Sequence, residues 1–527
     1  MTDSAPRWFF IALAAALAVR LFFAAAVPIT GDEAYFFYWG LAPDYGYYDH
    51  PPMAGWFAWV TQRFGEAEWV LRLPAVLLLA PVAGITVALA WPAGEARAWL
   101  AGLAVMLVPV EFLNIAFTTD TPLVLFVVAS VLAYAKALDG NRSAWYVAAG
   151  ALLGLALLSK YFAVLLAIAY FVFAVTSPRA ERRLSGFAIV VLSAVPFFAV
   201  NLLWNYWHCW ANVLFNLLNR HEGAGLGARS WETVAAYVAS VLYMLSAVAI
   251  VQLSRTRGWA RAMWANPRAR LALVTCAVPF ALFAVLSPFR TVGLHWFFAF
   301  VPSFYVAIAF ALTPRQLRLN VFVLAAATAL HLAAIAVAGV LPLETWQRLR
   351  IYDGLVMTVK SDELLDRLKA FTPEFALATD GYSPSVTLSY NARRQWGAGA
   401  VRASGGAVPA ALEPYMIVFG RGALRARHDD ILTDVARLDA GNILVFRKTP
   451  ADPADYEPYF ERVEYREFEV RGAKYYLVLG RGFRFAPYRD TVLVDIRNRW
   501  YRVPSWVPQG ECYLCSRYFG QPTCPAR

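Results

Sequence analysis

Residues 8–27 read WFFIALAAALAVRLFFAAAV, an apolar run with a single charged side chain, Arg20. About 20 apolar residues form a helix long enough to cross the hydrocarbon core of a bilayer. The run is too long for the apolar core of a cleavable signal. We therefore expect it to be retained as the first membrane-spanning helix.

Ten further apolar runs follow, and the chain as a whole is 60% hydrophobic and only 16% charged. The predicted spans are 7–27, 69–91, 97–117, 120–138, 143–158, 161–176, 186–206, 231–253, 271–288, 295–313 and 318–340. Soluble domains have about 45–50% apolar and about 25% charged residues, so this excess belongs in lipid. The sequence predicts a polytopic α-helical membrane protein with about eleven transmembrane helices.

The net charge of +11 comes mostly from loops between apolar runs, which favours membrane orientation over nucleic-acid binding as its explanation. Loops on one side carry fourteen Lys and Arg residues, against six on the other. By the positive-inside rule the N-terminus is cytoplasmic. Eleven spans then place everything after residue 341 on the outer side.

Two domains are expected: a transmembrane catalytic domain over 1–341 and a soluble extracytoplasmic α/β domain over 342–527. In the first outer loop, Met53, Trp56, Phe57, Val60 and Phe64 share one helical face after Pro51-Pro52. This predicts a helix over about 52–66 that lies in the outer interface. An ordinary amphipathic surface helix is the alternative.

The C-terminal domain combines a helix with short runs typical of strands. The helix is expected over 361–370, and the strands over 376–378, 415–419, 442–446, 475–479 and 491–495.

Ionisable groups of the membrane half fall almost entirely on the expected outer side, where such groups are functional candidates. The strongest are Asp32 and Glu33, directly after the first span, and Asp49 and His50 before the two prolines. A helix-capping role for Asp32 and Glu33, or a simple turn at Asp49-His50, is the structural alternative.

Four more candidates each have an equally plain structural explanation. Asp120 could cap the fourth span, because it precedes Thr121-Pro122. Lys160 could snorkel, and Arg290 and His295 could anchor an aromatic belt. His208 and His221 are weaker candidates.

Six short motifs occur in a fixed order: Asp-Glu-Ala-Tyr (32–35), Asp-His-Pro-Pro-Met (49–53), Thr-Asp-Thr-Pro (119–122), Leu-Ser-Lys-Tyr (158–161), Trp-Asn-Tyr (204–206) and Leu-His-Trp (294–296). As an ordered set they resemble the bacterial branch of the protein O-mannosyltransferase superfamily, glycosyltransferase family 39, which has the GT-C membrane fold and is related to the lipid A aminoarabinose transferases. The resemblance covers residues 1–340.

The resemblance implies that Asp32 is the catalytic carboxylate and that His50 contacts the donor phosphate. Where the aminoarabinose transferases usually have Glu-Lys-Pro-Pro, this chain has Asp49-His50-Pro51-Pro52. That departure fits the broader group of transferases that use polyprenyl-phosphate sugars. The implied place is a bacterial inner membrane, with a periplasmic C-terminal domain.

Such a transferase needs a carboxylate for the acceptor hydroxyl and cations for the leaving phosphate. We assign Asp32 as the base and Asp120 as a second carboxylate, with Glu33 and Asp49 in support. The phosphate contacts are His50, Lys160, Arg290 and His295. A single displacement inverts the anomeric centre. The acceptor is a lipid, a glycan or a protein.

No cofactor is required by this chemistry, and no Gly-rich phosphate loop points to a nucleotide. A divalent metal at Asp49 and His50 remains an alternative, although the spacing is poor in ligands. The rival function is a lipid-linked sugar flippase without catalysis. Transporters tend to place ionisable groups at the membrane midplane, whereas here they gather at one face.

Three cysteines crowd the C-terminus, at positions 512, 515 and 524, and Cys209 and Cys276 lie in or near spans. A zinc site would need a second Cys pair. In an oxidising outer compartment a disulfide is favoured, with one of the three thiols left over.

Overall fold

The fold is taken from a computed structural model of the 527-residue chain. It describes residues 5–140, 142–178, 184–219, 227, 229–420 and 426–526. The chain divides into two compact units. The first comprises Met1–Val27, Gly65–Val200 and Gly223–Gly339, and the second comprises Pro28–Phe64, Asn201–Glu222 and Val340–Arg527.

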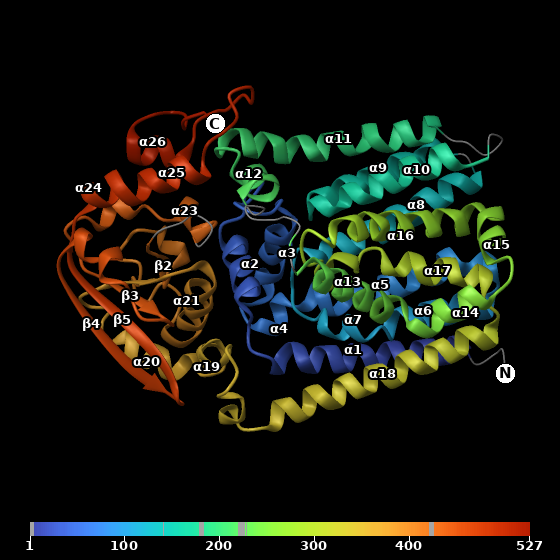
Figure 1. Ribbon diagram of the computed structural model, residues 1–527, viewed down its shortest axis with the longest axis horizontal. Coiled ribbons are helices and arrows are strands. Elements are labelled where there is room, and N and C mark those ends of the chain that lie inside the picture. The colour runs from blue at the N-terminus through green and yellow to red at the C-terminus, as the bar shows by residue number, and fades with distance from the viewer. Residues whose placement is uncertain are drawn as a thin grey trace. The chain divides into compact units, whose positions relative to one another are not determined.

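The first unit is helical. Its helices are α1 (Ala5–Ala26), α4 (Glu68–Leu71), α5 (Leu73–Ala90), α6 (Glu95–Met106), α7 (Pro109–Leu113), α8 (Asp120–Gly140), α9 (Ser143–Leu157), α10 (Val164–Thr176), α11 (Leu184–Trp207), α13 (Ser230–Leu245), α14 (Ala247–Arg255), α15 (Trp259–Ala265), α16 (Pro267–Leu286), α17 (Val301–Ala311) and α18 (Pro314–Val340). The last turns of α11 group with the second unit. Within the bundle α8 packs against α9, α5 against α6 and α10 against α16 (Figure 1).

Six described helices are long and apolar enough to cross a membrane, and a seventh span is formed if α13 and α14 count as one. The six are α1, the α4–α5 stretch, α8, α11, α16 and α18. The chain is therefore a multi-pass membrane protein.

The other five predicted spans are not confirmed as single long helices. The run 97–117 divides into α6 and α7 beside Pro109, and 231–253 bends by 82° between α13 and α14. The runs 143–158, 161–176 and 295–313 contain the shorter apolar helices α9, α10 and α17. Composition identifies apolar segments, but it does not say where a bend or a turn interrupts them.

Arg20 explains how α1 accommodates a charge inside an apolar span. Its guanidinium is buried and donates hydrogen bonds to the backbone oxygens of Ala75, Glu111 and Asn114, at 2.7–2.9 Å. The three acceptors satisfy a group that would be costly to bury alone.

The second unit contains a five-stranded sheet in the order β2-β1-β3-β5-β4. The strands are β1 (Ala376–Thr379), β2 (Ile417–Val418), β3 (Ile443–Arg447), β4 (Phe460–Val470) and β5 (Ala473–Phe483). β1 runs parallel to both β2 and β3, while β5 is antiparallel to β3 and to β4. Thus the expected C-terminal domain with a sheet is present.

The second unit also contains helices (Figure 1). They are α2 (Gly31–Leu41), α3 (Met53–Thr61), α12 (Ala211–Leu217), α19 (Tyr352–Val359), α20 (Ser361–Lys369), α21 (Tyr382–Trp396), α23 (Asp429–Leu432), α24 (Phe485–Tyr488), α25 (Val494–Trp500) and α26 (Tyr513–Phe519). The segment after the first apolar run, Pro28–Phe64, therefore groups with the C-terminal segment. The expected division at residue 341 stays a prediction.

Four expected strands and the helix at 361–370 are confirmed as β1, β2, β3, β5 and α20. The strand expected at 491–495 is wrong, because the chain there is helical and continues into α25. Val492, Ile496 and Trp500 are buried at helical spacing. The charged strand β4, at the edge of the sheet, was missed.

The helix expected over about 52–66 is present as α3, followed by a short 3₁₀ turn, Gln62–Phe64. Met53 on the predicted face is buried, whereas Val60 and Phe64 are exposed by 50% and 76%. Its position in a membrane interface stays a prediction.

Candidate functional site

Asp32 lies in the first turn of α2, where the local sequence sets the helix start. The Thr30 hydroxyl accepts a hydrogen bond from the backbone N–H of Glu33, and the Glu33 carboxylate accepts one from the Thr30 N–H at 3.0 Å. This capping box buries Glu33 and gives it a structural role. Asp32, one residue earlier, stays exposed.

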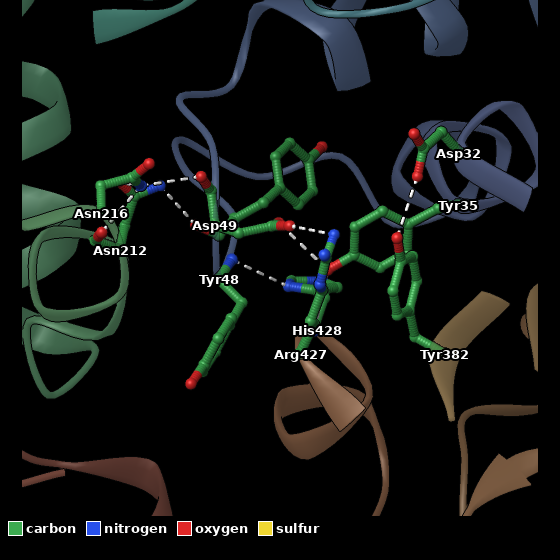
Figure 2. Close-up of polar contacts among 10 residues, drawn as sticks. Asp32, Tyr35, Tyr48, Asp49, Asn212, Asn216, Tyr382, Arg427 and His428 are labelled. Atoms are coloured by element: carbon green, nitrogen blue, oxygen red, sulfur yellow. Dashed lines mark hydrogen bonds and ion pairs between the residues drawn. The ribbon is translucent and has the colours of Figure 1, made fainter. Parts of the chain in front are cut away.

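A tyrosine from the C-terminal segment holds the Asp32 carboxylate. The Tyr382 hydroxyl donates a hydrogen bond to Oδ1 of Asp32 at 3.1 Å (Figure 2). Tyr382 is the first residue of α21, and α21 packs against α2. The approach of the two helices needs a glycine at 31, because a Cβ there would collide with the side chain of Ser383.

Asp49 is fully buried, and each of its two oxygens faces a donor. Its Oδ1 accepts a hydrogen bond from the Tyr35 hydroxyl at 3.1 Å, and its Oδ2 pairs with the Arg427 guanidinium at 3.0 Å. The Tyr35 hydroxyl in turn accepts the backbone N–H of His428 at 2.9 Å. Figure 2 shows Arg427 and His428 beside Asp49 and Tyr35.

Helix α12 fixes the backbone of the loop that carries Asp49. Asn212 donates to the backbone oxygen of Tyr47 at 2.8 Å, and Asn216 donates to that of Asp49 at 2.9 Å. The Tyr47 ring stacks on Trp39 at 4.1 Å. Three separate segments of the chain thus hold one short loop in place.

His428 is buried and accepts a hydrogen bond from the backbone N–H of Tyr48 through Nδ1, at 3.4 Å. Burial, helped by nearby His208, lowers the pKa of His428 to about 3. The ring is therefore neutral at physiological pH, which suits a nitrogen that accepts a hydrogen bond.

His50 lies at the edge of this network. Its backbone oxygen accepts the N–H of Tyr47, and its ring centre is 6.2 Å from that of Trp39. One Asp49 oxygen is paired with the Arg427 cation and the other accepts the Tyr35 hydroxyl, and a metal at Asp49 and His50 stays a prediction.

Four of the predicted site residues lie in the first unit. Asp120 and Lys160 are buried and form an ion pair with each other, at 2.8 and 2.9 Å. The Arg290 guanidinium lies 5.2 Å from the Trp296 ring, and His295 is exposed nearby. Their roles as phosphate contacts, and that of Asp120 as a second carboxylate, stay predictions. His208 stacks on Trp204, and His221 lies outside the described residues.

Reasoning from the sequence missed Tyr382, Arg427 and His428. Tyr382 follows the carboxyl end of β1, and Arg427 follows that of β2. Because these strands are parallel, both loops leave the sheet at the same edge. That edge is a common place for functional residues in α/β folds, and the strand pattern is the signal that points to it.

The cysteines pair differently from the expectation. Cys209 forms a disulfide with Cys512, and Cys515 forms one with Cys524. No thiol of the C-terminal group is left over, because Cys209 in the second unit provides the fourth sulfur. Cys276 is free and buried.

Part of the chain matches the model of a known protein family. Residues 49–204 match the model of the family described as dolichyl-phosphate-mannose-protein mannosyltransferase. The match starts at Asp49 and includes Asp120 and Lys160. It does not extend to Asp32, Tyr382 or Arg427.

Solved structures cover far more of the chain. Apo ArnT from Cupriavidus metallidurans superposes with a TM-score of 0.56 over 90% of this chain and 98% of ArnT, at 17% identity. The chain has the ArnT fold. ArnT bound to undecaprenyl phosphate gives a TM-score of 0.55 at the same identity, over 89% of this chain and 98% of ArnT.

A curated relative is the lipid A galacturonosyltransferase RgtD of Rhizobium johnstonii, 27% identical over 184 residues. The aligned segment covers 34% of this chain and 38% of RgtD. Together with the ArnT fold and the family match, this confirms the resemblance to the protein O-mannosyltransferase superfamily.

Proposed function

We propose that this protein is a glycosyltransferase that moves a sugar from a polyprenyl-phosphate-linked donor to an acceptor hydroxyl at the outer face of the cytoplasmic membrane. The observation that carries the proposal is Asp32: an exposed carboxylate, held by a tyrosine hydroxyl, beside a network built around the fully buried Asp49. The ArnT fold and the undecaprenyl phosphate held by one ArnT structure support the donor class.

In the proposed reaction Asp32 takes the proton of the acceptor hydroxyl as its oxygen attacks the anomeric carbon. The bond from that carbon to the phosphate oxygen breaks on the opposite face, so the configuration inverts. The phosphate leaves with the bonding electrons, and cations stabilise its growing charge. His50, Lys160, Arg290 and His295 are the proposed contacts, and the proposed reaction requires no nucleotide or metal.

The acceptor class to test first is a lipid. RgtD is named for transfer to lipid A, and 184 residues of this chain align with it at 27% identity. A glycan or a protein acceptor remains the alternative outcome of the same assay.

The decisive experiment uses purified full-length protein, a polyprenyl-phosphate sugar and a lipid A acceptor in liposomes without a gradient. Asp32→Asn should abolish transfer, whereas the exposed control Asp362→Asn should leave it unchanged. Product anomers read by NMR should be inverted.

Near-normal turnover by Asp32→Asn would remove the proposed base. Movement of the donor across the bilayer, without any product, would instead support the flippase. Both outcomes are read in the same liposomes.

A further inference from the structure

The catalytic carboxylate proposed above depends on a chain of contacts that begins in the C-terminal segment. We propose that Tyr382 is a positioning residue for Asp32, and that Arg427, anchored on Asp49, holds Tyr382 in place. This rests on the proposed function, because Asp32 is its base. It gives the C-terminal segment a part in catalysis itself.

The first contact is the hydrogen bond from Tyr382 to Asp32, which joins residues 350 positions apart. Burial, helped by the Asp32 charge, raises the pKa of Tyr382 well above its usual value. The phenol therefore stays protonated and remains a donor at any physiological pH. A neutral donor can orient a carboxylate without cancelling its charge, as a base requires.

The second contact fixes the tyrosine ring. The guanidinium carbon of Arg427 lies 3.9 Å from the centre of the Tyr382 ring, which is a close cation–π contact. The Tyr35 ring lies 5.1 Å from the same ring. Tyr382 is thus held between an arginine and an aromatic side chain.

The third contact fixes the arginine. Arg427 pairs with the fully buried Asp49, and its backbone φ is +53°, a left-handed conformation that non-glycine residues seldom adopt. Such strain persists only where surrounding contacts impose it, and it gathers at functional sites. In this backbone conformation the Arg427 guanidinium contacts both Tyr382 and Asp49.

The distribution of charge supports the same assignment. Burial by itself lowers the pKa of Arg427. The charges around it outweigh this effect, so the pKa of Arg427 is raised overall; they belong to Asp49, Tyr382, Tyr35 and Asp32. The arginine is fully charged, and its hydrogen bond goes to Asp49. With Asp49 as its partner, Arg427 leaves the Asp32 charge available for the acceptor proton.

The test is Tyr382→Phe, which removes the hydrogen bond and keeps the ring. Because a hydrogen bond to a charged group contributes about 1.5–3 kcal/mol, we expect kcat to fall about 10- to 100-fold, with the KM for donor within about 3-fold. The acid limb of the pH–rate profile should move to higher pH, since the ionised carboxylate loses a donor.

The matched control is Tyr38→Phe. The Tyr38 hydroxyl also links α2 to the C-terminal segment, through the backbone oxygen of Pro414 at 3.2 Å, but it does not touch Asp32. It should leave the pH–rate profile in place.

A second variant, Asp49→Asn, tests the chain from its other end and does not depend on Tyr382→Phe folding. It removes the anion that holds Arg427, so the freed guanidinium is drawn towards Asp32. The acid limb should then move to lower pH, opposite to the effect of Tyr382→Phe.

The inference and the proposed function fail in different ways. An unchanged pH–rate profile and kcat in Tyr382→Phe would overturn the positioning role while Asp32→Asn stays inactive. An active Asp32→Asn would overturn the proposed function, whatever Tyr382→Phe does. Shifts of the acid limb in the same direction for Tyr382→Phe and Asp49→Asn would also overturn the role given to Arg427.

Discussion

Asp49 is a fully buried carboxylate, and Arg427 is the charge that makes its burial tolerable. A buried ion costs several kcal/mol unless a partner and further hydrogen bonds compensate it. Asp49 has both, because Tyr35 donates to its other oxygen. The sequence shows the carboxylate next to His50 but gives no sign of a partner 378 positions away.

We predict that Arg427→Met lowers the free energy of unfolding by about 2–4 kcal/mol, because Asp49 is left charged, buried and without its cation. Chemical denaturation of the detergent-purified protein measures it. The control is Arg471→Met, which breaks an exposed pair with Glu363 and should cost less than about 1 kcal/mol. Equal losses in the two variants would contradict the structural role of the buried pair.

At the scale of the element, the N-terminal cap of α2 determines where Asp32 lies. Thr30 and Glu33 form a reciprocal cap that defines the first turn, and Asp32 lies within that turn. The alternative that these two carboxylates cap a helix therefore holds for only one of them. Glu33 takes part in the cap, whereas Asp32 bonds to Tyr382.

We predict that Thr30→Ala lowers stability by about 1 kcal/mol, because the N–H of Glu33 loses its acceptor. It should also lower kcat, since the first turn no longer holds Asp32 in place. Thr30→Ser keeps the hydroxyl and serves as the control in thermal unfolding and transfer assays. If Thr30→Ser is impaired as strongly as Thr30→Ala, the cap is not the cause.

At the scale of the whole molecule, one disulfide links distant segments of the second unit. Cys209 and Cys512 are 303 positions apart, and their bond joins the segment before α12 to the C-terminal tail. Disulfides persist in oxidising compartments, which agrees with the outer side proposed for this unit.

We predict that the double substitution of Cys209 and Cys512 by Ser lowers stability by about 2–5 kcal/mol, as loss of a native disulfide typically does. Thermal unfolding measures it, with Cys276→Ala, which removes a free thiol, as the control. Peptide mapping without reduction should recover the pairs 209–512 and 515–524. A peptide that links other cysteines would contradict this pairing.

The apolar runs and their order could be predicted, because lipid imposes a composition on any helix that crosses it. Six of the eleven runs are single long helices of this kind. The interruptions at Pro109 and between α13 and α14 could not be predicted from hydropathy, because neighbouring helices decide where a buried segment bends. The charged strand β4 was missed because it lies at the sheet edge. Most of its residues are not buried there, so its sequence lacks the apolar residues that indicate a strand.

By itself, the sequence determined that the chain is a multi-pass membrane protein, which segments are apolar, and that Asp32 and Asp49 lie in one short loop after the first apolar run. Only the tertiary structure decided which groups meet those carboxylates. Tyr382 and Arg427 come from loops after two parallel strands, more than 300 residues away. Local periodicity reports which face of an element is buried, whereas a contact between distant residues exists only once the intervening chain has folded.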